Sequence, residues 1–200
     1  RPNAPTGNSF PLAKMEEFCR QFDGVVLFDE AYADFAEDNC MELARRYSNV
    51  LVSRTFSKSY SLAGLRLGYV VGNPVLIDGL MKLKDSYNVD RLAQELGMAA
   101  LSDSDYLAAT TAKIVATRTR LARELTALDF HVVPSQANFV FASHPGRDAA
   151  ALSRALRERA IIVRHFGAQR IAQWLRITIG TPAECEALVG ALREILAQPA

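Results

Sequence analysis

The sequence predicts an α/β protein built from two units. Helix-like and strand-like stretches alternate through the first half of the chain, which is the pattern of a parallel sheet covered by helices. A long amphipathic segment follows from about residue 105 to 128, and beyond it a second series of strands and helices begins. We therefore expect part of a larger domain with a mostly parallel sheet over residues 1–102, and a smaller α/β domain over residues 103–200.

In the first unit, apolar residues recur at i, i+3 and i+4 between Leu12 and Phe22, which predicts a helix that Gly24 ends. Val25–Phe28 forms a continuous apolar run after this glycine. Such a run is typical of a strand that is buried on both faces of a parallel sheet. The other elements of this unit are expected as strands at 49–55 and 65–72 and as helices at 74–85 and 92–101.

The second unit begins with the long helix at 105–128, in which leucine and isoleucine recur at heptad spacing. Its length of about 36 Å would let it run from one domain into the next. Ser102, with Asp105 three residues later, resembles a capping box at its start.

The last predicted helix, 182–196, has the best-marked beginning in the chain. Thr181 is suited to the N-cap, Pro182 to the first helical position, and Glu184 to closing a capping box. The other elements of the second unit are expected as strands at 130–133, 138–142, 161–164 and 174–179 and as a helix at 148–159.

Composition narrows the possible functions. The 200 residues are 50% hydrophobic and 22% charged, and the net charge is only +1. Because the charges are mixed in sign, we expect neither nucleic acid nor a membrane as a partner. No apolar run approaches the about 20 residues that span a bilayer, and no secretory signal opens the chain. Three scattered cysteines without metal-ligand spacing favour a cytoplasmic location and no metal site.

The densest group of reactive side chains follows the strand predicted at 49–55. Lys58 lies between hydroxyl residues that include Thr55 and Ser57, and Arg66 comes eight residues later. A lysine amine can form a Schiff base, and hydroxyls with a guanidinium can hold a phosphate group. Taken alone, however, Lys58 is more simply interpreted as a surface lysine in a polar loop.

Asp29 and Tyr32 complete this set. Asp29 ends the first buried strand, at the edge where ligands bind in open α/β sheets, and Tyr32 follows three residues later. Separately, they could be a turn aspartate and a packing tyrosine. Together with Lys58 they provide an amine for an aldehyde, a carboxylate for a ring nitrogen and a phenol for a ring oxygen. These are the groups that pyridoxal 5'-phosphate requires of its protein.

Four segments carry a resemblance to a known family, and they are Pro2–Gly7, Asp29–Tyr32, Thr55–Lys58 and Gly64–Tyr69. In this order and spacing they resemble the class I/II aminotransferases of fold-type I, and most of all the histidinol-phosphate branch. The resemblance covers essentially all 200 residues. It implies pyridoxal phosphate as the cofactor and transamination as the activity.

The resemblance also implies roles for individual residues. Lys58 would bind the cofactor covalently and move the proton at the substrate Cα, Asp29 would pair with the ring nitrogen, and Tyr32 would hydrogen-bond the ring oxygen. The phosphate of the cofactor would be held by Thr55, Ser57 and Arg66.

Three further assignments concern residues outside this set. Arg176 would bind the α-carboxylate of a keto acid such as 2-oxoglutarate, and Arg164 would contact a phosphate on the amine donor, unless it is simply a solvated strand-end arginine. Ala4 stands where the family commonly has an asparagine that contacts the cofactor, so Asn3 is its candidate replacement.

The leading hypothesis is thus transamination of histidinol phosphate with 2-oxoglutarate, to imidazole acetol phosphate and glutamate, in histidine biosynthesis. The family's members are usually homodimers. Alternatives are an aminotransferase or decarboxylase acting on another amino acid, and a non-catalytic sensor domain of a transcription regulator. The family also has a further large-domain portion before the Pro5-Thr6-Gly7 loop, so this chain could be an inactive C-terminal portion.

Overall fold

The computed structural model describes residues 1–198, and the chain divides into two compact units. The first unit contains Arg1–Pro2 and Ser9–Thr111, and the second contains the loop Asn3–Asn8 and the chain from Ala112 onward. The division falls inside a long helix, rather than at the boundary that we place between residues 102 and 103. Among the described residues, no helix is long and apolar enough to cross a membrane.

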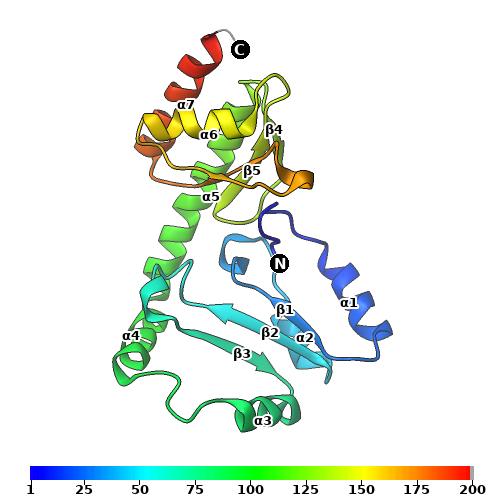
Figure 1. Cartoon of the computed structure of the whole chain (residues 1–200). Coiled ribbons are helices and arrows are strands. Elements are labelled where there is room, and N and C mark those ends of the chain that lie inside the picture. Colours follow the sequence, from blue (N-terminus) through cyan, green and yellow to red (C-terminus); the bar gives the residue numbers. More distant parts are fainter. Residues whose placement is uncertain (199–200) are drawn as a thin grey trace. The chain divides into compact units, whose positions relative to one another are not determined.

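The first unit contains a three-stranded sheet in the order β1-β2-β3 (Figure 1). Its strands are β1 (Val26–Asp29), β2 (Val50–Thr55) and β3 (Gly68–Gly72). β1 pairs with β2 in parallel, whereas β3 pairs with β2 antiparallel. The α/β class is confirmed, but the orientation expected for β3 is wrong. The twelve residues between β2 and β3 contain no α-helix that could form a crossover, and they turn the chain back so that β3 runs antiparallel to β2.

The helices of this unit are α1 (Leu12–Gln21), α2 (Met41–Arg46), α3 (Pro74–Leu83) and α4 (Arg91–Ser102), with 3-10 turns at Ala33–Phe35 and Ala63–Leu65. Of these, α1 and α2 pack against one face of β1 and β2. Val26 and Phe28 of β1 are buried in a cluster with Cys19 of α1 and Leu43 of α2. Leu27 points to the other face of the sheet and is 56% exposed. The prediction of a strand buried on both faces is therefore wrong for the described residues.

The second unit contains a four-stranded sheet in the order β4-β5-β7-β6, with every neighbouring pair antiparallel. Its strands are β4 (His131–Val133), β5 (Phe139–Ser143), β6 (Arg164–His165) and β7 (Leu175–Thr178). Its helices are α5 (Ser104–Thr126), α6 (Ala149–Glu158) and α7 (Pro182–Ala197), with a 3-10 turn at Gln169–Ile171. β6 is shorter than the predicted strand at 161–164.

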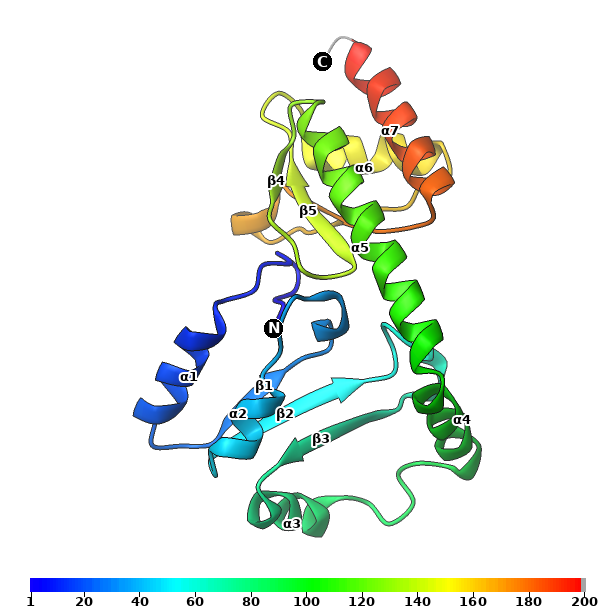
Figure 2. The ribbon, with the colours of Figure 1, turned by 180° about the vertical axis from the view of Figure 1, so that it is seen from behind.

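The core of the second unit lies between its helices and one face of its sheet. Leu121 of α5, Leu156 of α6 and Leu192 of α7 are fully buried there in one cluster with Val140 and Ile177. Figure 2 shows the ribbons of α5, α6 and α7 beside β4 and β5. Side chains alternate along a strand, so Phe139, Phe141 and Arg176, which pair across β5 and β7, belong to the opposite face. That second face is the one that carries functional candidates.

Helix caps confirm one prediction and correct another. The Thr181 hydroxyl accepts a hydrogen bond from the Glu184 N–H at 3.3 Å, and the Glu184 carboxylate accepts one from the Thr181 N–H at 2.6 Å, which is the predicted capping box. At α5 the prediction is wrong. Ser102 is the last residue of α4, and Asp103 instead accepts from the Tyr106 N–H at 3.2 Å.

Candidate active site

Lys58 and Tyr32 lie together in the first unit. Lys58 is exposed in the loop after β2, and its Nζ lies 5.4 Å from the centre of the Tyr32 ring. The Lys58 carbonyl accepts a hydrogen bond from the Ser61 N–H at 3.1 Å, so the lysine is held in a turn. An ammonium over an aromatic face is stabilised by the ring's quadrupole.

Asp29 occupies the last position of β1, where one oxygen of its exposed carboxylate accepts from the Ala31 N–H at 3.0 Å. β1 and β2 are parallel, with Asp29 opposite Ser53. Their carboxyl ends therefore share one edge of the sheet, so Asp29 and the loop after Thr55 leave the sheet on the same side. This is the position at which open α/β sheets bind ligands.

Thr55, Ser57 and Arg66 form a group of donors beside this edge. The Ser57 N–H donates to the Thr55 hydroxyl at 3.1 Å, and Nη1 of Arg66 lies 3.5 Å from the Ser57 hydroxyl. Arg66 adopts a left-handed backbone conformation, with φ of 53°, and the same Nη1 donates to the Ala63 carbonyl at 2.9 Å. Two hydroxyls and a guanidinium in this arrangement suit a phosphate group.

Next to these residues lies a largely buried polar cluster that the sequence did not indicate. It is named the Arg54 network and comprises Glu30, Asp34, Arg54 and Ser59. Arg54 donates to one oxygen of Glu30 from Nε at 2.9 Å and Nη2 at 2.8 Å, and to Asp34 from Nη1 at 2.8 Å. The Ser59 hydroxyl donates to the second oxygen of Asp34. Neither periodicity nor composition indicates these pairings, because they join residues about 25 positions apart that only the β1–β2 register brings together.

The second unit brings its two predicted arginines together. Arg164 of β6 and Arg176 of β7 stand directly opposite each other in the ladder. Their Cζ atoms lie 5.6 and 6.0 Å from the centre of the same Phe166 ring, and Arg176 also lies 5.2 Å from the Phe139 ring. The Arg176 Nε is buried and has no hydrogen-bond partner among the described residues. Like charges placed opposite each other are unfavourable, so this pair suits an anion.

Asn3 lies in the second unit, in the loop Asn3–Asn8. Its side-chain amide donates to the Thr6 hydroxyl at 2.7 Å, within its own loop. The loop is tied to the sheet side of this unit by a hydrogen bond from the Gln136 N–H to the Gly7 carbonyl at 2.8 Å. Asn3 as a cofactor ligand therefore stays a prediction.

Other reactive side chains are engaged in structural contacts. His131 packs edge-on to Trp174, and Nε2 of His165 lies 2.8 Å from the Ala172 carbonyl. The described residues contain no group of three or more side chains placed to hold a metal ion. All three cysteines are buried and free. Burial raises their pKa values, that of Cys40 to about 12, which makes them poor nucleophiles.

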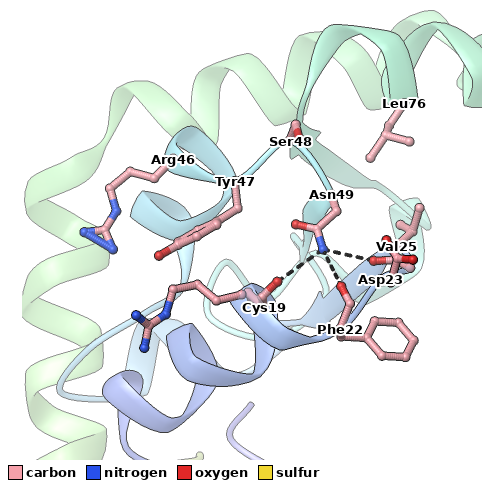
Figure 3. Close-up of a pocket in the computed structure, with 11 residues that line it drawn as sticks. Cys19, Phe22, Asp23, Val25, Arg46, Tyr47, Ser48, Asn49 and Leu76 are labelled. Atoms are coloured by element: carbon pink, nitrogen blue, oxygen red, sulfur yellow. Dashed lines mark hydrogen bonds between the residues drawn. The ribbon is translucent and has the colours of Figure 1, made fainter.

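A surface hollow of about 660 Å³ in the first unit contains none of the predicted site residues. Figure 3 shows that it lies where α1 ends, with Arg46 and Tyr47 on one side. Here the Asn49 side-chain amide donates to the carbonyls of Cys19, Phe22 and Gly24 at 3.0–3.3 Å. The hollow thus lies where the Asn49 side-chain amide caps the carbonyl groups at the end of α1, and we assign it a structural role.

Known proteins match nearly the whole chain, and they belong to one family. A family model described as aminotransferase class I and II matches residues 1–192. A histidinol-phosphate aminotransferase from Gluconacetobacter diazotrophicus is 56% identical over 203 residues, which cover 100% of this chain and 57% of that protein. The chain therefore spans little more than half the length of the curated relatives it matches.

Solved structures share the fold. The crystal structure of histidinol-phosphate aminotransferase from Sinorhizobium meliloti, in complex with pyridoxal-5'-phosphate, has a TM-score of 0.87 at 30% identity, over 98% of this chain and 55% of that one. A decarboxylase from Sulfurospirillum multivorans has a TM-score of 0.86 at 28% identity, over 98% and 60%. The predicted fold-type I architecture is confirmed. With the family model matching almost every residue, this chain belongs to the aminotransferase class I and II family.

Proposed function

We propose that this chain is the part of a pyridoxal phosphate-dependent aminotransferase that carries the cofactor lysine. Its reaction would convert histidinol phosphate and 2-oxoglutarate to imidazole acetol phosphate and glutamate. The observation that carries the proposal is the placement of Lys58, Tyr32 and Asp29 at one sheet edge, beside a set of phosphate donors. The relatives at 50–56% identity are named for the same reaction.

The residues at this edge fit pyridoxal phosphate by their chemistry. The cofactor has an aldehyde, a ring nitrogen, a ring hydroxyl and a phosphate, and the edge offers an amine, a carboxylate, a phenol and a group of hydroxyls with a guanidinium. Lys58 and Asp29 are both exposed, so neither is hidden from a ligand. Thr55, Ser57 and Arg66 already lie within hydrogen-bond reach of one another.

Each residue then has a defined task. The Lys58 amine would form the covalent bond to the cofactor and afterwards accept and return the proton at the substrate Cα. The Asp29 carboxylate would keep the ring nitrogen protonated, since a nearby opposite charge favours the charged form. The Tyr32 hydroxyl would donate to the ring oxygen, and Arg66 would bind the phosphate with the two hydroxyl residues. When bound, the cofactor supplies an electron sink for the carbanion formed at Cα.

The second unit would supply substrate specificity. Arg176 has a buried Nε without a partner among the described residues and lies across the ladder from Arg164. We assign Arg176 to the α-carboxylate of the keto acid and Arg164 to the phosphate of the amine donor. Two guanidiniums that share the Phe166 ring suit a pair of substrates in which one carries phosphate and the other carboxylates.

Decarboxylation is the second candidate function, because a decarboxylase shares the fold at 28% identity. The two reactions separate by their products. With histidinol phosphate and 2-oxoglutarate, an aminotransferase forms glutamate and releases no carbon dioxide. Carbon dioxide from an amino-acid donor without glutamate would favour the decarboxylase.

The cofactor assignment is tested by titrating the purified chain with pyridoxal phosphate and recording visible absorbance. We expect saturable binding that Lys58→Ala abolishes and that Lys14→Ala, a change of an exposed lysine on α1, leaves intact. Amine donors are then compared by steady-state kinetics. If the chain alone is inactive, the comparison uses a protein that contains this chain and has the length of the curated relatives. Equal use of phosphorylated and unphosphorylated donors would refute the substrate assignment.

A homodimer and a cytoplasmic location, together with a domain boundary between residues 102 and 103, stay predictions.

A further inference from the structure

The Arg54 network is too buried to be explained as surface charge pairing. The Glu30 side chain is 0% exposed and that of Arg54 is 11% exposed. The second oxygen of Glu30 accepts a further hydrogen bond from the Cys40 N–H at 2.5 Å. Buried ion pairs of this kind are on average no more stabilising than apolar side chains of similar volume. A role in fixing geometry therefore accounts for the network better than a gain in stability.

Members of the network are neighbours in sequence of the candidate site residues. Glu30 directly follows Asp29, and Ser59 directly follows Lys58. Asp34 belongs to the 3-10 turn that begins just after Tyr32. Arg54 bonds to Glu30 and Asp34 at once, so one guanidinium ties the end of β1 to the turn that carries the tyrosine. Through the Ser59 hydroxyl, Asp34 then holds the lysine loop to the same point.

Three aromatic side chains pack together near this arrangement, and one of them, Tyr69, stands opposite Arg54 in the β2–β3 ladder. The Phe56 ring lies 4.9 Å from the Tyr60 ring and 5.9 Å from the Tyr69 ring, measured between ring centres. Burial raises the pKa of both tyrosines, and the Asp34 carboxylate raises them further. Both phenols therefore stay neutral near physiological pH, so they add no charge beside the network. The hydrogen bonds between the buried Glu30 and Arg54 side chains are electrostatically stronger than they would be in water.

We propose that the Arg54 network positions Lys58 over the Tyr32 ring, and that the Ser59–Asp34 hydrogen bond is the link that fixes the lysine loop. Ser59 and Asp34 are on this account positioning residues, which act through Lys58 rather than on a ligand. The inference deepens the proposed function, because it assigns a purpose to the network only if Lys58 is the cofactor lysine. The position of Lys58 itself can be measured without the cofactor.

The test uses the cofactor-free chain and a limiting amount of acetic anhydride, with acetylation at each lysine quantified by peptide mass spectrometry. Lys82 on α3 is exposed and serves as the internal reference. In the wild-type chain the Lys58 Nζ lies against the Tyr32 ring, so we expect that this contact must be broken before the reagent can reach the amine. We expect Ser59→Ala to raise the Lys58-to-Lys82 ratio by about threefold, the size of a surface cation–π contact. Ser59→Thr keeps the hydroxyl and should restore the wild-type ratio.

Two further variants make the test specific. Asp34→Asn removes the charge that Ser59 and Arg54 share, so it should raise the ratio as Ser59→Ala does. Ser61→Ala removes an exposed hydroxyl from the same loop and should leave the ratio unchanged. Hydrogen exchange gives a second readout, because the Ser61 N–H bonds to the Lys58 carbonyl and should exchange faster in Ser59→Ala. Circular dichroism of each variant confirms that the fold is retained.

An unchanged acetylation ratio and unchanged Ser61 exchange in Ser59→Ala and Asp34→Asn would overturn the inference. An equal change in Ser61→Ala would overturn it as well, because any disturbance of the loop would then suffice. Pyridoxal phosphate binding to the wild-type chain is measured alongside. If the wild-type chain does not bind pyridoxal phosphate at all, the proposed function is refuted, whatever the acetylation ratios show. If the cofactor binds at Lys58 but the Ser59 and Asp34 variants change neither the acetylation ratio nor the Ser61 exchange, only the positioning role is refuted.

Discussion

Glu30→Gln is expected to destabilise the first unit far more than an ordinary surface charge change. The Glu30 carboxylate accepts hydrogen bonds from Arg54 at 2.8 and 2.9 Å and from the Cys40 N–H at 2.5 Å, and its side chain is fully buried. The neutral amide would leave the Arg54 guanidinium, which is 11% exposed, with only Asp34 as an ionic partner. Breaking a buried pair from one side costs about 3–5 kcal/mol, a large part of the about 5–15 kcal/mol by which domains are stable.

The assay is urea unfolding followed by circular dichroism, since the single tryptophan, Trp174, lies in the second unit. Glu42→Gln is the matched control, because Glu42 pairs with Arg45 at 3.4 Å and both side chains are more than half exposed. Surface pairs of that kind contribute about 0–1 kcal/mol. The double change Glu30→Met with Arg54→Met should recover part of the loss, because it removes the buried carboxylate and the buried guanidinium together and leaves only the partly exposed Asp34 without its ionic partner. A loss in Glu30→Gln no larger than in the Glu42 control would refute the reasoning.

Three further outcomes are expected. Leu156→Ala, at a fully buried position in the core of the second unit, should reduce stability by about 2–5 kcal/mol in urea unfolding followed by Trp174 fluorescence, and a loss under about 1 kcal/mol would contradict that core. None of the three cysteines should react quickly with a thiol reagent at pH 7 in the folded chain, whereas all should react in urea; rapid native reaction would contradict their burial. Hydrogen bonds from Thr181 lower the pKa of Glu184 below its ordinary value of 4.5, so their stabilising effect is present above that value and is lost as pH falls through the lowered pKa. Thr181→Ala should therefore destabilise the chain by about 1 kcal/mol at pH 7 and by less below pH 4, and an equal loss at both pH values would argue against the capping box.

Local signals in the sequence were sufficient where short-range chemistry decides the structure. The capping box of Thr181 and Glu184 sets the start of α7, and the apolar run before Asp29 sets β1. Asp29 and Thr55 end strands and Lys58 lies in the loop that follows β2, which is why the sequence indicated them as candidates for a ligand site; that role stays a prediction. The residue types and their order along the chain thus predicted a Schiff-base lysine and a phosphate-binding group, without their positions in space.

Features that depend on pairing between distant segments could not be predicted. The antiparallel direction of β3 depends on the path of the twelve residues that connect it to β2, and no periodicity in the sequence indicates that path. The Arg54 network arises because the β1–β2 register places Glu30 beside the end of β2. In the second unit, the opposition of Arg164 and Arg176 depends on the β6–β7 register in the same way.

The measurement that tests the account most directly is the location of a reduced cofactor adduct. The chain is incubated with pyridoxal phosphate, treated with borohydride, digested and mapped by mass spectrometry. The account predicts a single pyridoxyl group on the peptide that contains Lys58. A label spread over exposed lysines such as Lys14 and Lys82, or no label on Lys58, would contradict it.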